Sequence, residues 1–339
     1  MNPSIHFDGQ LWRCSLRCAD YGLPSGYEIR SDKAKPGQSR TKNAMIIFDP
    51  TDWKPLEIYK MKERDDLPRA SSGSVGYEDI RLFRTDKGWL QGIAAALHLL
   101  RTDRREQLAE QVLLSFDEEY NIAEALPIRG DWSKPHRAEK NWAPFDNCVE
   151  PRFLYAIEAG KLFDDRGELS GSAAQVRLST RSRRSFEPNE RAIRRARERA
   201  VEIERERVRE ERRRERSQEN RKRSLSLTVA QAANYEGLRG GTQLVCVDDD
   251  SWLGIGHAMQ FVDGLKVYWH VWYLADSYGK MKAASPPMKL APNNGIEFAA
   301  GLAIDGDRVV VSFGVDDMES KIGETKLSAV RGMLRSIDH

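Results

Sequence analysis

One short pattern occurs five times along the 339 residues of this chain and limits the folds open to it. Each copy is an apolar strand-like run, a tight turn and a second apolar run. The copies read PSIHFDGQLWRCSLRC, EDIRLFRTDKGWLQGIAAAL, WAPFDNCVEPRFLYAIE, TQLVCVDDDSWLGIGHAM and IEFAAGLAIDGDRVVVSFGV. Four turns contain Asp or Gly, which adopt the conformations of a tight reversal: Asp8-Gly9, Asp86-Lys87-Gly88, Asp248-Asp249-Asp250 and Asp305-Gly306-Asp307. Each copy is therefore predicted to form a β-hairpin.

Several hairpins are followed by a third strand-like run. KNAMIIFD follows the first hairpin, EQVLLSFD the second and LKVYWHVWYLAD the fourth. Antiparallel units repeated along a whole chain are typical of radial folds, in which each small sheet packs against its neighbours. We predict an all-β, five-bladed β-propeller, with blades one to three in residues 1–170 and blades four and five in residues 229–339. A β-sandwich would use similar strands without requiring one repeating unit.

The connection between the third and fourth copies, residues 171–228, has a different composition. Arg177–Arg223 holds 19 Lys and Arg against 10 Asp and Glu, a net charge of +9, so the rest of the chain carries −7. Pro188 suits a first helical turn, and the Arg, Glu and Ala residues after it run on without Gly or Pro. We predict a long charged α-helical insertion. It is either a solvated helix projecting from the body or a contact for nucleic acid, another polyanion or a protein.

Polar residues stand at the entrance of the predicted inner strands. In a propeller, the starts of these strands converge on one axial funnel. The entrance residues are Asn2, Glu78, Asp79, Arg81, Lys140, Asn141, Thr242 and Glu297, and the residues that follow second strands are Arg17, His257, Asp316 and Asp317. Carboxylates, cations and amides together suit a polyhydroxylated ligand, which needs hydrogen bonds of both polarities.

The cysteines and the chain start restrict cofactors and location. Cys14, Cys18, Cys148 and Cys246 form no CxxC pair and no zinc-type spacing, so we expect free thiols, no metal and no cofactor. The opening MNPSIHFDGQLW lacks the basic and apolar regions of a signal peptide, and no run approaches the roughly 20 apolar residues of a membrane span. We expect a soluble, cytoplasmic protein.

In order and spacing, several of these motifs resemble a known group. The stretches NPSI, YEDIRLF, EKNWAPF, GGTQL with WLGIGHA, and GIEFAAGLAIDGDRVVVSFGVDD are similar to five-bladed-propeller carbohydrate-active proteins related to the family-130 glycoside phosphorylases and hydrolases. The resemblance covers nearly the whole chain except the basic insertion. It implies a sugar site at Glu78, Asp79 and Arg81, where Ile80 replaces the family's proline, and further contacts from the following residues: Lys140, Asn141, His257 as a phosphate contact, and Asp316 or Asp317.

Two departures from the family pattern argue against phosphorolysis. The family's proton-donating aspartate would fall in AAALH, which offers only His98, and a phosphate-holding arginine is missing from FLYAIEAG.

Three classes of function remain open. The first is an enzyme acting on a glycoside or an activated sugar, such as a sugar phosphate or sugar nucleotide. In it, Asp79 is catalytic, Asp316 or Asp317 is the opposing acid or base, and Arg81 orients the carboxylates. The second is a noncatalytic sugar-binding propeller, and the third a polyanion-associated protein that uses Arg177–Arg223. The structural alternatives are an ion-pair clamp between blades at Glu78, Asp79 and Arg81, a packed His257, and a turn at Asp316-Asp317 that caps the last blade.

Deleting the basic insertion should leave a folded body, because its few large apolar residues offer little burial at about 25 cal/mol per Å². The melting temperature of the deletion variant measures this, and a drop of many degrees would contradict the expectation. If the insertion binds a polyanion, the deletion should also remove most of that affinity, along with its steep salt dependence.

Overall fold

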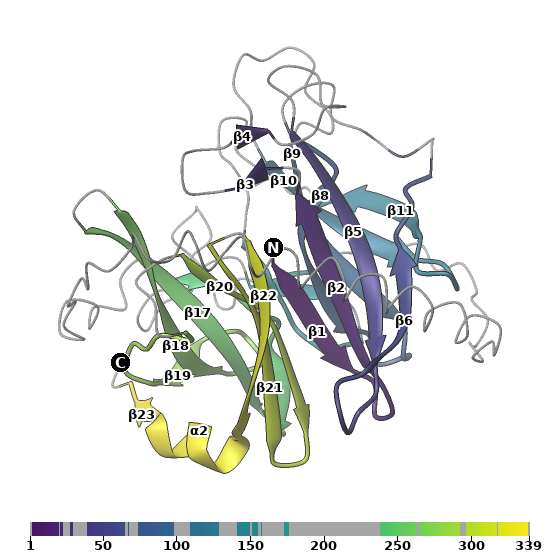
Figure 1. Cartoon of the computed structure of the whole chain (residues 1–339). Coiled ribbons are helices and arrows are strands. Elements are labelled where there is room, and N and C mark those ends of the chain that lie inside the picture. Colours follow the sequence, from purple (N-terminus) through teal and green to yellow (C-terminus); the bar gives the residue numbers. More distant parts are fainter. Residues whose placement is uncertain are drawn as a thin grey trace.

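The structure is a computed structural model that describes residues 2–19, 21–22, 28–29, 39–64, 67, 74–97, 109–128, 141–149, 151–154, 157, 173–175, 238–262, 265–291, 296–316 and 318–337. The described chain is all-β and propeller-like, and contains one short helix, α2 (Leu327–Met333). Figure 1 shows the first two sheets on one side of the molecule and the last two on the other, with β1 between them. The predicted all-β, propeller-like architecture is confirmed.

Four sheets are large. The first contains β1 (Pro3–Phe7), β2 (Trp12–Ala19), β5 (Ser39–Phe48), β6 (Pro55–Lys60) and β7 (Ser74–Val75). The second contains β8 (Tyr77–Arg84), β9 (Leu90–Leu97), β10 (Ala109–Phe116) and β11 (Ile122–Pro127). The fourth contains β15 (Arg239–Gly240), β16 (Val245–Asp248), β17 (Ser251–Val262), β18 (Leu265–Ala275), β19 (Met281–Ala284) and β23 (Arg335–Ser336). The fifth contains β20 (Glu297–Asp305), β21 (Arg308–Val315) and β22 (Glu319–Lys326).

The third sheet is much smaller, so the described residues form four blades, and the predicted count of five is wrong. It consists of β12 (Ala143–Pro144), β13 (Arg152–Leu154) and β14 (Ala173–Gln175), and a separate two-stranded ribbon joins β3 (Tyr21–Gly22) to β4 (Glu28–Ile29). The run FLYAIE resembles a longer strand, and among the described residues its pairing covers Phe153 and Leu154, while Tyr155 and Ala156 lie outside the described residues. Strands of two or three residues cannot form a blade comparable to the other four.

The long charged insertion, expected at residues 171–228, lies outside the described residues except for β14. The three residues of β14 pair with β13 and so belong to the third sheet.

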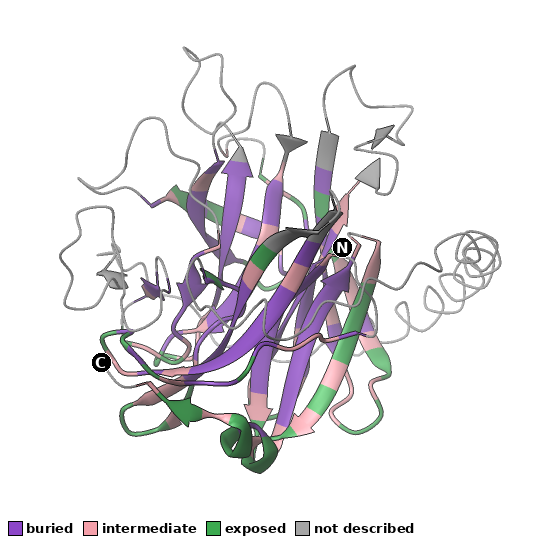
Figure 2. Cartoon of the chain, turned by 90° about the vertical axis from the view of Figure 1, so that its left-hand side faces the viewer, coloured by how far each residue is buried: buried purple, intermediate pink, exposed green. Residues whose placement is uncertain are grey.

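All five predicted hairpins are antiparallel pairs: β1–β2, β8–β9, β12–β13, β16–β17 and β20–β21. Burial explains why their apolar runs are continuous. β20 and β21 are buried on both faces over most of their length, whereas β22 alternates between exposed and intermediate residues. Figure 2 shows the same gradient from purple inner strands to green and pink outer ones. The Lys and Glu residues of β22 also discourage pairing with another chain at this edge.

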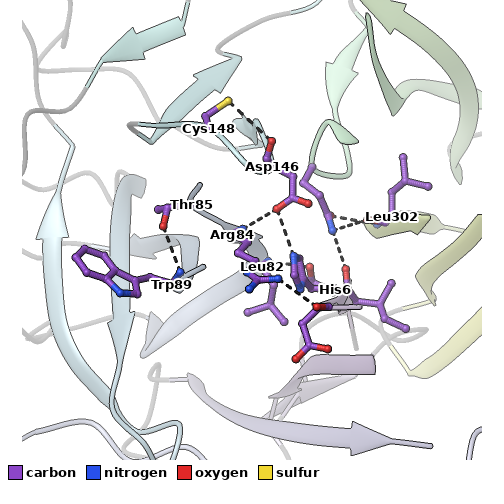
Figure 3. A network of polar contacts seen from close by, with 12 residues as sticks. His6, Leu82, Arg84, Thr85, Trp89, Asp146, Cys148 and Leu302 are labelled. Carbon is purple, nitrogen blue, oxygen red and sulfur yellow. Dashed lines mark hydrogen bonds and ion pairs between the residues drawn. The ribbon is translucent and has the colours of Figure 1, made fainter. Parts of the chain in front are cut away.

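Hydrogen bonds join the inner segments of successive sheets. Ser4 Oγ accepts from Leu82 N at 2.9 Å, joining the first sheet to the second, and Leu244 N donates to Pro144 O at 2.7 Å between the third and fourth units. Asp146 Oδ1 lies 3.3 Å from His6 Nε2 and accepts from Arg84 N at 2.6 Å, as Figure 3 shows. These contacts join the inner strands of different sheets along their length and at the far ends of β1 and β8.

Gln243 forms several hydrogen bonds of this inner network. Its amide Nε2 donates to Ile5 O at 2.7 Å and to Leu302 O at 2.5 Å, and its Oε1 accepts from Leu302 N at 3.1 Å. The side chain is fully buried. One residue therefore satisfies backbone groups of both the first and the fifth sheet.

Replacing Gln243 by Leu should lower the free energy of unfolding by about 3 kcal/mol or more, because it leaves several buried backbone groups without partners at about 1–3 kcal/mol each. Urea unfolding followed by circular dichroism measures the loss. The matched control is Gln10→Leu in the exposed β1–β2 turn, which should change stability by less than about 0.5 kcal/mol. Equal effects of the two substitutions would contradict this role of Gln243.

Candidate functional site

The inner strands of the sheets begin at a common end of the molecule, and their first residues are polar. Asn2 precedes β1, Glu78 and Asp79 open β8, Asn141 precedes β12, and Glu297 opens β20. Direct contacts link several of these residues, although they lie far apart in the sequence. The predicted convergence of Asn2, Arg17, Glu78 and Asp79 is therefore present in the structure.

Arg17 and Asn2 hold the two neighbouring carboxylates of β8. Arg17 Nη1 lies 2.9 Å from Asp79 Oδ1, and its Nη2 lies 3.1 Å from Glu78 Oε1. Asn2 Nδ2 donates to the same Asp79 oxygen at 2.8 Å. Arg17, from the second strand of the first hairpin, thus orients both carboxylates, a role that the sequence had led us to expect of Arg81.

Asp79 is displayed by an irregular backbone. The β8–β9 register shifts between Glu78 and Arg81, and Asp79 has a φ of +52°. A bulge re-aims side chains that a regular strand would alternate between its two faces. Positive φ is uncommon outside glycine, and Asp and Asn are among the residues that tolerate it best. The bulge leaves the Asp79 side chain 16% exposed, against 7% for Glu78.

Arg81 is fully buried and anchors three other units. Its Nε donates to Gly241 O, its Nη2 donates to Asn141 Oδ1 at 3.0 Å, and its guanidinium lies 5.3 Å from the centre of the Phe298 ring. Burial lowers the Arg81 pKa to about 10, against the opposing charge of Asp79. The adjacent Gly240 cannot carry a side chain, because a Cβ there would lie 2.3 Å from Asn141 O. Arg81 is therefore a structural anchor beneath the site and does not reach its surface.

A second polar group surrounds Glu297 at the start of β20. Glu297 is completely buried, and its Oε2 accepts from Leu290 N at 2.7 Å. Lys289 Nζ lies 3.8 Å from Glu297 Oε1 and 5.4 Å from the centre of the Trp269 ring, and His270 Nδ1 lies 3.8 Å from Glu297 Oε2. Burial raises the pKa of Glu297 and lowers that of Lys289. Both shifts move this pair towards its neutral forms.

Two histidines in this region are held neutral. His270 Nε2 accepts from Ala299 N at 3.3 Å, so its proton lies on Nδ1, the nitrogen facing Glu297. Burial, with the charge of Lys289, lowers the His270 pKa to about 3. Burial first, and then the charges of His270 and Arg81, hold the His257 pKa well below its ordinary value.

His257 is packed between aromatic rings. It stacks on Tyr268 at 5.4 Å and meets Phe298 edge-on at 5.0 Å, and 3% of its surface is exposed. A neutral, packed ring is a weak ligand for an anion such as phosphate. His257 and Arg81 both lie against the Phe298 ring. These contacts agree with the alternative of a packed histidine.

Asp316 lies at the end of β21, next to the start of β20. It has a φ of +51°, its Oδ1 accepts from Ile296 N at 3.1 Å, and its own N–H donates to Ile296 O at 2.7 Å. Its charge contributes to the pKa shifts of both Glu297 and Lys289, so it belongs to the same electrostatic group. Asp316 remains partly exposed, unlike Glu297.

The remaining predicted residues fall into two classes. Lys140 and Asp317, like His98, lie outside the described residues. Thr242 is buried, and its hydroxyl bonds only backbone groups among the contacts recorded: it donates to Gln243 O at 2.9 Å and accepts from Ile255 N at 3.0 Å. We assign Thr242 to the fold.

Sequence reasoning missed Lys289, His270 and Phe298. His270 lies in the apolar run YWHVW, which reads as a core strand, and Lys289 lies in the connection PPMKLAP. The available signal was Lys289 itself, a single cation that follows two prolines and precedes an apolar strand. Nothing in the sequence around Lys289 links this lysine to Glu297.

Within the described ranges, no group of three or more His, Cys, Asp or Glu side chains could hold a metal ion. No described helix is long and apolar enough to cross a membrane.

No family model and no curated protein matches the chain. Several solved structures do, all at low identity. A β-1,2-mannobiose phosphorylase from Listeria innocua is 13% identical with a TM-score of 0.48, covering 98% of this chain and 90% of the other. A putative glycoside hydrolase from Parabacteroides distasonis is 12% identical with a TM-score of 0.47, covering 95% and 85%. A structure from the GH130 family of mannoside phosphorylases is 10% identical with a TM-score of 0.48, covering 96% and 84%. The last of these is named for the same family, family 130, that the sequence motifs resemble.

The buried histidines predict a loss of stability in acid. Because the folded pKa of His270 is lowered, the unfolded chain takes up its proton first as the pH falls below about 6.5. Stability is therefore full above that pH and declines towards pH 3, by up to about 1.4 kcal/mol per pH unit for one histidine. Between its ordinary pKa and its raised one, Glu297 acts in the opposite direction, so the comparison must be made against a histidine variant.

Replacing His270 by Gln, which retains an acceptor for Ala299 N, should flatten the dependence of unfolding free energy on pH by about one proton between pH 6.5 and 3.5. Urea titrations at a series of pH values measure the slope. His257→Gln should act in the same direction. An unchanged slope in both variants would show that neither histidine is held neutral by burial.

Proposed function

We propose that this chain is a carbohydrate-active enzyme that cleaves or transfers a glycosidic bond at the strand-entrance site. The observation that carries the proposal is Asp79, a partly exposed carboxylate re-aimed by a bulge at positive φ and fixed on one oxygen by Arg17 and Asn2. Strained, over-determined backbone of this kind concentrates at functional sites. A clamp between sheets would not need the carboxylate to remain exposed.

Glycosyl transfer requires two groups in complementary roles. One protonates or stabilises the departing oxygen, and the other activates the incoming nucleophile or attacks directly. Asp79 and Asp316 are partly exposed carboxylates on different sheets, each fixed by hydrogen bonds. In the proposal they fill these two roles, with Asp317 the alternative to Asp316, while Glu78, Arg17 and Asn141 hold sugar hydroxyls and Lys140 contacts a hydroxyl or an activating group.

A noncatalytic sugar-binding protein is the second candidate, and one observation favours it. Glu297, the entrance carboxyl whose pKa burial raises, has no exposed surface and so cannot protonate a bound sugar without movement. If neither Asp79 nor Asp316 can act as the acid, the site binds sugar and performs no chemistry. Binding without turnover identifies this case.

Contact between Arg177–Arg223 and a polyanion is a separate proposal. It rests on the net charge of that segment alone, and the segment lies outside the described residues.

Substitutions at the two carboxylates that pair with Arg17 separate a catalytic role from a structural one. Asp79→Asn and Glu78→Gln each remove one carboxylate charge from Arg17 while conserving volume. Their losses of stability should therefore be similar. Asp79→Asn should lower kcat on a glycoside or sugar-phosphate substrate by about two to four orders of magnitude, the range for general acid–base groups. Glu78→Gln should act mainly on KM.

A broad screen of glycosides and activated sugars provides the substrate, with rates normalised to folded protein by thermal melting. If Asp79→Asn melts the protein but any activity found survives per folded molecule, the Asp79 cluster is a clamp and the site assignment is wrong. If wild type binds a sugar by calorimetry and turns over none of the substrates, the binding protein is the correct class.

A further inference from the structure

Two cysteines lie on neighbouring segments of the third and fourth units. The segment after β12 and the segment leading into β16 run parallel: Phe145 pairs with Leu244, and Asp146 N donates to Leu244 O at 2.8 Å. Cys148 follows Phe145 by three residues, and Cys246 follows Leu244 by two. Counted from the Phe145–Leu244 pair, Cys246 corresponds to Asn147, the chain neighbour of Cys148, and Cys148 itself pairs with Thr85, directly after β8. The two cysteines therefore lie one residue out of register on adjoining segments of the same junction.

The two side chains also lie on the same side of these segments. Cys246 is directly opposite Trp252 in the β16–β17 pair, and residues directly opposite share a face of the sheet. Trp252 and Cys148 both pack against the same apolar cluster, which includes Phe145 at 5.8 Å from the Trp252 ring. Figure 3 shows the Cys148 thiol next to Asp146, at the junction of the sheets.

The other cysteines do not share this arrangement. Cys14 is fully enclosed in the first sheet, and Cys18 is near the end of β2. Cys246 is exposed and Cys148 half-buried, so an oxidant can reach this pair. Burial raises the pKa of Cys148, and the charge of a Cys246 thiolate adds to that shift, as expected of two nearby thiols.

We propose that Cys148 and Cys246, free thiols in this structure, form a disulfide under oxidising conditions and staple the third unit to the fourth. With a small-molecule disulfide as oxidant, the thiolate of one cysteine attacks a sulfur of the reagent and releases one thiol. The second thiolate then attacks the mixed disulfide, forms the Cys148–Cys246 bond and releases the other thiol. The protein loses two protons and two electrons, and the reagent is reduced to two thiols.

The staple would act on the anchor beneath the candidate site. Asn141 and Gly241, which bind Arg81, lie upstream on the two segments that the bond would join. The bond would also close the long connection that includes residues 171–228. Because burial raises the pKa of both thiols, little thiolate is present at neutral pH. Bond formation should therefore be slow near pH 7 and faster at alkaline pH, as for a stabilising crosslink rather than a rapid sensor.

The test uses the full-length protein, oxidised with excess oxidised glutathione at pH 7 and pH 9, then alkylated and digested with trypsin. Cleavage after Lys140, Arg152, Arg239 and Lys266 gives peptides 141–152 and 240–266, each with one cysteine. The expected product is these two peptides joined with the loss of two hydrogens, formed faster at pH 9. The oxidised protein should melt roughly 5 °C or more above the reduced protein, and reductant should reverse the shift.

Cys148→Ser and Cys246→Ser should each abolish both the joined peptide and the shift in melting temperature, whereas the control Cys18→Ser should retain them. Crosslinks between chains, a crosslink to Cys18, or glutathione adducts alone would overturn the proposal. None of these readouts uses a sugar, so the result is independent of the proposed enzymatic function.

Discussion

The arrangement of the site depends on the hydrogen bonds of one buried group, the guanidinium of Arg81. Removing such a charge from water costs several kcal/mol unless its donors are satisfied. Its recorded hydrogen-bond acceptors come from other units, Asn141 before β12 and the backbone of Gly241 before β16, and Phe298 of β20 lies against its face. The second, third, fourth and fifth units must therefore assemble around one side chain. Burial of Arg81 therefore favours the meeting of the polar strand entrances, together with the contacts of Arg17 and Asn2.

Three of the six described non-glycine residues with positive φ lie at the same end of the molecule. Asp79, Asn141 and Asp316 have positive φ, and each is at a strand entrance or at the end of a strand beside one. Trp53, Tyr120 and Asn147 share this conformation in connections between strands. Positive φ outside glycine costs of order 1–3 kcal/mol and persists only where the surroundings impose it. At the entrances, Asn2, Arg17, Arg81 and Ile296 supply those surroundings through hydrogen bonds.

The hairpins could be predicted from the sequence because turn chemistry and alternation are local. Asp8-Gly9 and Asp305-Gly306-Asp307 specify reversals whatever surrounds them, and both hairpins form as expected. The size of the third sheet could not be predicted, because an apolar run such as FLYAIE does not reveal how many of its residues find a partner strand. Convergence of Asn2 and Asp79 followed from the repeat, but the exchange of roles between Arg17 and Arg81 did not. That choice depends on which guanidinium is enclosed when the sheets close, a property of the assembled fold.

The signs of the charges at the entrance favour a neutral, hydroxyl-rich ligand over a polyanion. Arg17 forms ion pairs with both Glu78 and Asp79. Lys289 lies beside Glu297, and the charge of Asp316 also acts on it. Arg81 is enclosed and cannot reach a ligand. At Arg17, Arg81 and Lys289 a polyanion would therefore meet cations that are enclosed or already beside carboxylates. A polyol donates hydrogen bonds to the carboxylates and accepts them from amide and guanidinium groups, so it can satisfy both signs at once.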